Sequence, residues 1–169
     1  MSPKNNLTRR AVLVLAAMSA FAGPVLAAAA RTRVTVWKTP NCGCCKDWVK
    51  HLETNGFEVV THDVKETASK RQALGLAEKY GSCHTATVNG YVLEGHVPAR
   101  DIQRLLRDKP SAIGLAVPGM PVGSPGMEMG DTRDAYNVML VLRDGNSRVY
   151  KSYPAIASSS TFNHLKETS

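Results

Sequence analysis

The stretch TRVTVWKTPNCGCCKDWVKHLET, residues 32–54, combines the patterns of a strand, a turn and a helix around three cysteines. Polar and apolar residues alternate over Thr32–Lys38, which is typical of a half-buried strand. Thr39-Pro40-Asn41 indicates a turn, and apolar residues recur with helical spacing over Lys46–Thr54. The stretch therefore predicts a strand that leads into a cysteine motif at the N-terminus of a helix.

The segments that follow extend this unit to the element order β-α-β-α-β-β-α. A second strand is predicted over Phe57–Val64 and an interrupted helix over Glu66–Tyr80. Asn89-Gly90 predicts the turn of a hairpin that covers Ala86–Leu93, because this dipeptide favours tight hairpin turns. A final helix is predicted after Pro98. This order is that of an α/β fold with a thioredoxin-like core, in which the first strand leads into a cysteine motif.

The rest of the chain is expected to lie outside this core. Residues 111–130 hold five Gly, three Pro and three Met without a sustained period, so we expect an irregular, ordered loop. An extra C-terminal β-hairpin is predicted over residues 134–153, with its turn at Asp144-Gly145. Residues 154–169 have the composition of a polar tail. One domain over residues 31–153 is therefore expected.

Residues 1–30 have the pattern of a secretory signal peptide. A basic head is followed by the apolar run Ala11–Gly23 and by the small residues Ala27–Ala30, the order that signal peptides share. The run is too short to favour the alternative, an N-terminal anchor helix. Arg9-Arg10 also resembles a twin-arginine export signal, so the export route stays open. We expect the mature domain to be exported to a compartment in which disulfides persist.

The basic charge of the chain does not indicate a nucleic-acid partner. Its 169 residues carry a formal net charge of +7, but the leader holds three of the 21 Lys and Arg and none of the 14 Asp and Glu. The mature domain is left with +4, and aromatic residues make up only 6% of the chain. Scattered basic residues with few aromatic side chains argue against nucleic-acid binding. No later segment is long and apolar enough for a transmembrane helix, so no membrane partner is expected after removal of the signal.

Three cysteines within four residues, Cys42, Cys44 and Cys45, are the main candidate site. At a helix N-terminus the pKa of a thiol falls, and the thiolate is both the nucleophile and the metal ligand. A dithiol redox site needs two sulfurs, and a third thiol beside them competes by exchange. Three neighbouring thiols suit a soft metal better, because one sulfur can bridge two ions.

The fourth cysteine is expected to face this triplet. In thioredoxin and glutaredoxin folds a cis-proline loop before the third strand faces the cysteine motif, and counting back from Asn89-Gly90 places His84 at that position. Cys83 and His84 then supply a thiol and an imidazole where those folds have an unreactive proline ring. His96, just before the last core helix, is a further candidate ligand at the same end of the sheet, whereas His51 is expected to face solvent.

The methionines of residues 111–130 add soft thioether donors. Met120, Met127 and Met129 lie outside any helical or strand period, so they are candidate axial ligands or a site that hands metal to a partner. Each could equally cover an edge of the core, and Met139 fits the core of a strand. Thiolate and thioether donors favour Cu(I), with zinc next.

Other functions of the four cysteines stay open at this point. In an exported domain they could form two structural disulfides, for example Cys42–Cys45 and Cys44–Cys83, among three connectivities. A periplasmic thiol-disulfide oxidoreductase that uses Cys42 and Cys45 is the main enzymatic alternative. A copper chaperone without redox activity would use the Met-rich loop for transfer.

Four motifs, in the same order along the chain, resemble one family. They are VWKTPNCGCC at residues 36–45, SCHTA at 82–86, GYVLEGHVPA at 90–99 and GLAVPGMPVGSPGME at 114–128. The family comprises small periplasmic metal-binding proteins long described as a domain of unknown function, and it includes the CopG-type copper-resistance proteins.

The resemblance implies a thioredoxin-like fold, a periplasmic location and copper held by the cysteines as a thiolate-bridged cluster of several ions. It also implies a role in copper detoxification, by storage or by redox conversion between Cu(I) and Cu(II). Whether the chain is a copper-dependent oxidoreductase stays open. The implied partners are copper ions and a periplasmic copper-handling or electron-transfer protein.

Overall fold

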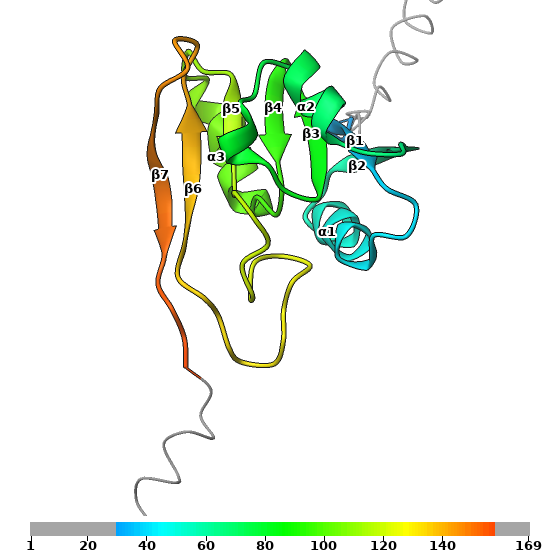
Figure 1. The fold of residues 1–169 in the computed structure, drawn as a ribbon, viewed down its shortest axis with the longest axis vertical. Coiled ribbons are helices and arrows are strands. Elements are labelled where there is room, and N and C mark those ends of the chain that lie inside the picture. The colour runs from blue at the N-terminus through cyan, green and yellow to red at the C-terminus, as the bar shows by residue number, and fades with distance from the viewer. Residues whose placement is uncertain (1–29, 158–169) are drawn as a thin grey trace, which may run out of the picture. The chain divides into compact units, whose positions relative to one another are not determined.

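Seven strands form one mixed sheet in the computed structural model, which describes residues 30–157 (Figure 1). The strands are β1 (Arg33–Lys38), β2 (Glu58–Asp63), β3 (His84–Val88), β4 (Tyr91–Glu94), β5 (Gly114–Ala116), β6 (Tyr136–Val141) and β7 (Ser147–Tyr153). Their order is β2-β1-β3-β4-β5-β6-β7, with the β1–β2 and β4–β5 pairs parallel and the others antiparallel. The predicted signal peptide, apart from Ala30, and residues 158–169 of the predicted tail lie outside the described residues.

Three α-helices and one short 3₁₀ helix connect the strands in this part of the chain. They are α1 (Gly43–Thr54), α2 (Ala68–Ala73), η1 (Glu78–Tyr80) and α3 (Ala99–Asp108). The order of elements up to α3 confirms the predicted β-α-β-α-β-β-α arrangement. α1 begins at Gly43 rather than Lys46 because Cys42 caps it, and the backbone N–H of Cys45 donates to the Cys42 sulfur at 3.3 Å. Among the described helices, none is long and apolar enough to cross a bilayer.

The predicted irregular loop over residues 111–130 contains a strand, and the prediction was wrong there. β5 pairs in parallel with β4 and antiparallel with β6, so it joins the C-terminal hairpin to the core sheet. Gly114 makes this pairing possible, because a Cβ atom at this position would lie 1.7 Å from the carbonyl oxygen of Val92. A strand of three residues beside Gly and Pro is too short to show a period of two in the sequence.

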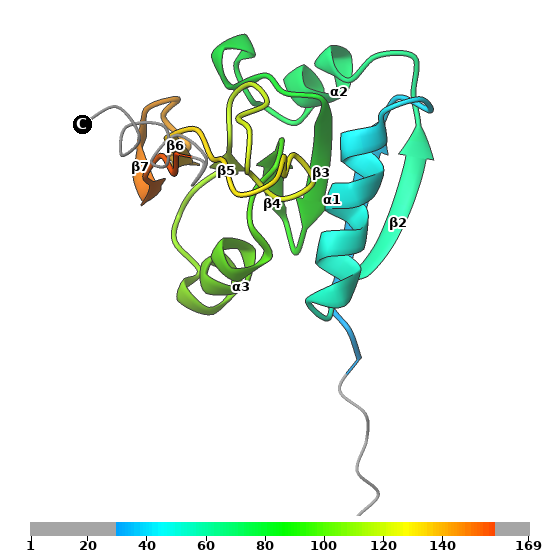
Figure 2. The same ribbon diagram turned by 90° about the horizontal axis from the view of Figure 1, so that it is seen from below.

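The two faces of the sheet carry cores of different size, and α2 and α3 lie on opposite sides of the strands (Figure 2). α1 and α3 cover the larger core, in which Trp48 and Leu52 of α1 and Ile102 and Leu105 of α3 are fully buried. The segment from α2 to η1 lies over the other face. The smaller cluster on that face consists of Leu76, Tyr80, Val92, Ala116 and Val141.

The sheet register brings the start of α1 next to the start of β3. β1 and β3 are antiparallel, and Lys38, the last residue of β1, pairs with His84, the first residue of β3. The chain therefore leaves β1 and enters the turn before Cys42 beside the segment that carries Cys83. This meeting of a helix N-terminus with the start of a strand positions the cysteine cluster.

Candidate metal centre

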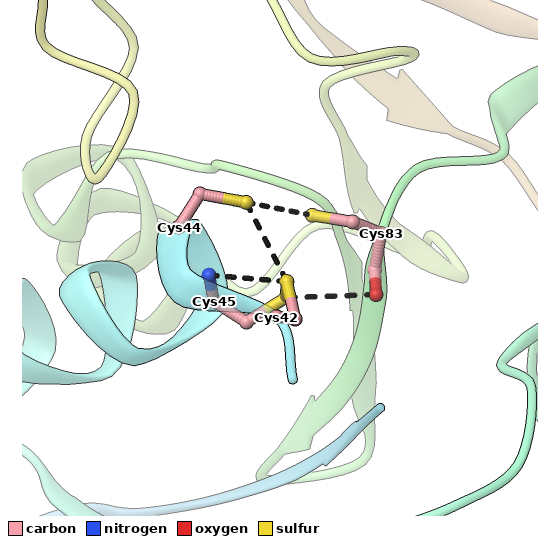
Figure 3. A group of neighbouring side chains, drawn as sticks. All are labelled: Cys42, Cys44, Cys45 and Cys83. Carbon is pink, nitrogen blue, oxygen red and sulfur yellow. Dashed lines mark hydrogen bonds between the residues drawn. A yellow bond between two sulfur atoms is a disulfide. The ribbon is translucent and has the colours of Figure 1, made fainter. Parts of the chain in front are cut away.

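All four cysteines of the chain lie in one cluster. The Sγ atom of Cys44 lies 3.5 Å from that of Cys42 and 3.8 Å from that of Cys83. Cys44, at the start of α1, and Cys83, before β3, point toward one another (Figure 3). Cys45 is fully buried beneath them, whereas the other three are half-buried. The four sulfurs are therefore close enough to bind a common metal ion, and three of them are exposed enough for an ion to reach them.

Two of the cysteines are oxidised in this structure. A disulfide joins Cys42 to Cys45, while Cys44 and Cys83 are free thiols. The sequence left this pairing open, as one half of a two-disulfide arrangement. The Sγ atom of Cys45 also lies 3.6 Å from the carbonyl oxygen of Cys83, which packs the bridge against the segment before β3. A site with four thiolate ligands therefore requires prior reduction of this disulfide.

His96 directs an unprotonated ring nitrogen at the thiol of Cys83. Its Nε2 atom lies 3.0 Å from the Sγ atom of Cys83, and its Nδ1 atom lies 2.7 Å from the carbonyl oxygen of Pro125. A carbonyl oxygen only accepts, so Nδ1 carries the proton and Nε2 of the neutral ring faces the sulfur. A backbone carbonyl on the far nitrogen is the arrangement that fixes histidine ligands of metals.

His84 reaches the same sulfur from the start of β3. Its Nδ1 atom lies 3.3 Å from the Sγ atom of Cys83, and its ring packs against that of Trp48 with centroids 4.3 Å apart. The side chain is fully buried, and its Nε2 atom has no hydrogen-bond partner. A buried polar atom without a partner costs stability, and it is the other ring nitrogen, Nδ1, that faces the Cys83 sulfur as a possible ligand atom.

Burial favours the uncharged forms of Cys83, His84 and His96. It raises the pKa of the Cys83 thiol to about 12, with a smaller contribution from the charge of Cys44. It lowers the pKa of His84 to about 3, with a smaller contribution from the nearby His96, and it lowers the pKa of His96 as well. A cation that displaces the thiol proton thus meets nitrogen lone pairs rather than positive charge.

The possible donor atoms form two groups that share one sulfur. One group contains the sulfurs of Cys42, Cys44, Cys45 and Cys83, and within it all atoms lie within 4.8 Å of one another. The other, equally tight, consists of Cys83, His84 and His96. Sulfur and imidazole donors without a carboxylate form a soft set, which fits Cu(I) or zinc better than a hard cation such as Mg²⁺.

Comparisons with known proteins identify relatives of this chain. The family described as "Protein of unknown function, DUF411" matches residues 80–127, a segment that includes Cys83, His84 and His96. Two solved structures of "Copper resistance protein copG", Form 1 and Form 2, are 50% and 49% identical to this chain, each with a TM-score of 0.71. Each match covers 74% of this chain, and 99% and 100% of the respective CopG chains. This chain belongs to the CopG family. A search of curated proteins found no match.

In this CopG homologue, the Met-rich loop contacts the cluster through backbone atoms. The carbonyl of Gly119 accepts a hydrogen bond from the hydroxyl of Ser82, the neighbour of Cys83. The carbonyl of Pro125 accepts from His96. Gly126 lies against the start of α1, where an added Cβ atom would be 2.7 Å from the carbonyl oxygen of Cys44. The loop therefore packs against both segments that carry the cysteines.

The methionine side chains of the loop differ in their exposure. Met120 and Met129 are 54% and 67% exposed, and Met127 is half-buried. Met120 directly follows Gly119 and so lies close to the segment of Cys83, with most of its side chain in water. The structure thus brings the predicted cysteines and histidines into the two donor groups and leaves two of the three predicted methionines largely in solvent.

Two polar residues near the cysteine cluster have roles that the sequence did not reveal. Glu94 is fully buried beneath the segment of Cys83 and His84. His51, predicted to face solvent, instead accepts a hydrogen bond at Nε2 from the backbone N–H of Ala99 at 3.0 Å, so that prediction was wrong. The available signal for His51 was its spacing of three residues from the buried Trp48, which places both on one side of α1.

Proposed function

We propose that this CopG homologue is a periplasmic copper-binding protein of copper resistance that holds Cu(I) in a cysteine-bridged, multinuclear site. One observation carries the proposal, namely that the donor atoms form two groups sharing the Sγ atom of Cys83. A thiolate sulfur can bridge two soft metal ions, so a shared sulfur supports a site for more than one Cu(I).

The proposal gives each predicted ligand a role. Reduction of the Cys42–Cys45 disulfide frees all four cysteines as thiolate ligands. His84 and His96 complete the group around Cys83 with neutral nitrogens. The thioethers of Met120, Met127 and Met129 lie outside these two donor groups. They act as second-tier ligands or as a gate for entering copper.

The difference in softness between the donor groups supports conversion between Cu(I) and Cu(II) as a finer part of the proposal. The group with four sulfurs favours Cu(I), whereas imidazole nitrogens also suit Cu(II). Oxidation of a Cu(I) ion held near His84 and His96 would therefore give Cu(II) among donors that suit it, and the electron released would pass to an electron-transfer protein as partner.

The scaffold and the location are also part of the proposal. The element order β-α-β-α-β-β-α, with a cysteine motif between β1 and α1, supports a thioredoxin-like core. The basic, apolar and small-residue order of residues 1–30 supports export to the periplasm. A periplasmic copper-handling or electron-transfer protein is the partner that such a site would serve.

Anaerobic titration of the fully reduced protein with Cu(I), followed by desalting and metal analysis, tests the proposal. We expect retention of more than one copper ion per chain, with intense thiolate-to-copper absorption. The double variant Cys44→Ser Cys45→Ser should lose most of this copper. A control, His62→Ala, removes an exposed imidazole that stacks on Trp37 and should leave the stoichiometry unchanged. No copper on the wild type, or full retention by the double variant, would overturn the proposal.

A second candidate function is that of a thiol-disulfide oxidoreductase, favoured by the Cys42–Cys45 disulfide at the start of α1. Helix N-termini stabilise the thiolate of such a motif, which makes it an effective redox pair. The thiol of Cys44, 3.5 Å from the Cys42 sulfur, competes by exchange and argues against it. Insulin reduction by metal-free protein distinguishes the two functions. Robust turnover that survives Cys44→Ser would favour the oxidoreductase.

A further inference from the structure

We propose that Glu94 is a positioning residue, which holds the Cys83–His84 segment in the geometry that lets Cys83 serve both donor groups. The proposal rests on the proposed copper function of the site. It assigns Glu94 no contact with copper, because its carboxylate acts through the backbone and side chains beside the ligands.

The carboxylate of Glu94 binds both ends of the ligand segment. Its Oε1 atom accepts a hydrogen bond from the backbone N–H of Ser82 at 2.8 Å. Its Oε2 atom accepts one from the Thr85 hydroxyl at 2.7 Å. Ser82 and Thr85 directly flank Cys83 and His84, so one rigid group fixes the four-residue segment at its two ends.

A guanidinium group holds the carboxylate itself in place. Nη1 of Arg71, on α2, lies 3.4 Å from Oε1 of Glu94, and the two side chains are 10% and 0% exposed. A buried carboxyl group without a partner is costly, so the contact with Arg71 offsets part of the cost of burying Glu94. Arg71 also packs over Gly81, whose carbonyl accepts the N–H of Gly119 at 2.9 Å. The support therefore extends from α2 to the loop that covers the cluster.

Glu94 and His84 lie on opposite faces of the sheet. Thr85 and Glu94 are directly paired across β3 and β4, and their side chains share the face that α2 covers. His84 precedes Thr85, so it points to the other face, where it packs on Trp48. The carboxylate can therefore set the position of Cys83 and His84 without competing for the metal.

The fit between the end of β4 and the ligand segment is tight. Gly95, with φ of +69°, donates its N–H to the carbonyl of His84 at 3.0 Å. A Cβ atom at Gly95 would lie 2.5 Å from the Ser82 hydroxyl oxygen. His96 follows immediately and contacts the Cys83 sulfur. The same chain segment thus carries the Glu94 carboxylate, the close backbone contact at Gly95 and the candidate ligand His96, so the positions of these three groups are coupled.

The test compares Glu94→Ala and Glu94→Gln with Asp101→Asn. Asp101 is a matched control, because it is also a buried acid that accepts a hydroxyl hydrogen bond, from Tyr153 at 2.6 Å, but on α3. The first readout is the Cu(I) affinity of the reduced proteins against a chromophoric Cu(I) chelator, together with the thiolate-to-copper absorption spectrum. The second is the rate at which iodoacetamide alkylates Cys83 relative to Cys44 in metal-free protein, measured by peptide mass spectrometry.

We expect Glu94→Ala to weaken Cu(I) binding about 10- to 100-fold, the usual effect of losing a partner that orients a ligand. The spectrum should change, and Cys83 should be alkylated faster relative to Cys44. Glu94→Gln keeps an acceptor for one of the two bonds and should lie between the wild type and Glu94→Ala. Asp101→Asn should lower the melting temperature while leaving affinity, spectrum and alkylation ratio unchanged.

Wild-type affinity, spectrum and alkylation ratio in Glu94→Ala would overturn the proposal, even if its melting temperature falls as far as that of Asp101→Asn. If Glu94→Ala does not fold, the same readouts on Glu94→Gln decide. If the wild type itself binds no Cu(I), the proposed function fails. The alkylation ratio of the metal-free protein still tests whether Glu94 positions the Cys83–His84 segment. The two failures are therefore distinguishable.

Discussion

The imidazole of His96 is held between the Cys83 sulfur, 3.0 Å from Nε2, and the Pro125 carbonyl, 2.7 Å from Nδ1. The ring therefore connects the ligand segment before β3 to the Met-rich loop. Its orientation is set by the backbone carbonyl, so the lone pair of Nε2 faces the cluster without rearrangement. This relationship makes His96 the clearest test of the second donor group.

We predict that His96→Ala lowers the number of bound Cu(I) ions without abolishing binding. The variant removes a donor from the group around Cys83 and leaves the four sulfurs in place. Metal analysis after anaerobic loading should give a lower, non-zero copper-to-protein ratio than the wild type. The exposed His62→Ala serves as control, and an unchanged ratio in His96→Ala would show that the second group holds no copper.

We predict that Gly126→Ala destabilises the protein more than Gly145→Ala. The two glycines have nearly equal φ angles, +83° and +85°, so both substitutions cost about 1–2 kcal/mol of backbone strain. Only at Gly126 does the new Cβ atom clash, at 2.6 Å from the backbone nitrogen of Trp48, which adds about 1–3 kcal/mol. Urea denaturation of the two variants measures the difference, and equal losses would show that the loop does not pack tightly on α1.

We predict that His51 contributes to a loss of stability in acid. Burial lowers its pKa, with a smaller opposing contribution from Glu128, and its Nε2 atom must stay unprotonated to accept the Ala99 N–H. The unfolded chain then binds more protons than the folded one, so stability is fully present above about pH 6.5 and falls as pH drops through and below that value.

The variant His51→Gln isolates this contribution, because its amide oxygen can still accept from Ala99 but does not titrate. Melting temperatures between about pH 5 and 7 should depend less on pH in the variant than in the wild type. Part of the dependence should remain, since the pKa values of His84 and His96 are lowered in the same direction. An identical pH dependence in both proteins would contradict the role of His51.

We predict that replacing the three loop methionines by leucine slows copper transfer to an acceptor and leaves tight binding intact. Leucine preserves volume and apolar character but removes the thioether. Exposure of Met120 and Met129 makes them available to an incoming or leaving ion. Stopped-flow transfer to a chromophoric chelator compares the triple variant with Met139→Leu, a control on β6. Equal transfer rates would reject a role of the loop methionines in handover.

Much of the site follows from the sequence because its signals are local. Three cysteines within four residues after a predicted strand indicate a cluster at a helix start, and the Asn89-Gly90 turn fixes the position of Cys83 and His84 by counting along one strand. The choice of disulfide partner did not follow, since it depends on which sulfurs the folded backbone brings into contact. The pairing of Cys42 with Cys45 is a property of the capped first turn of α1.

The features that the sequence concealed depend on contacts between distant segments. Glu94 matters because the β3–β4 register places it opposite Thr85 and because Arg71 approaches from α2. The three residues lie on three different elements, so the pattern of a single helix or strand does not contain them all. β5 was missed for a related reason, since its three residues form a strand only when two other strands flank them. A strand of that length has no pattern of its own.

The position of β5 changes what the C-terminal part of the chain is for. Because β5 pairs with β4 on one side and β6 on the other, the segment between β5 and β6 is tied to the sheet at both ends. That segment supplies the Pro125 carbonyl that orients His96. A chain truncated after α3 would therefore keep every cysteine and histidine of the cluster but lose the loop that packs against it. The C-terminal hairpin of β6 and β7 anchors that loop to the sheet, because β6 pairs with β5.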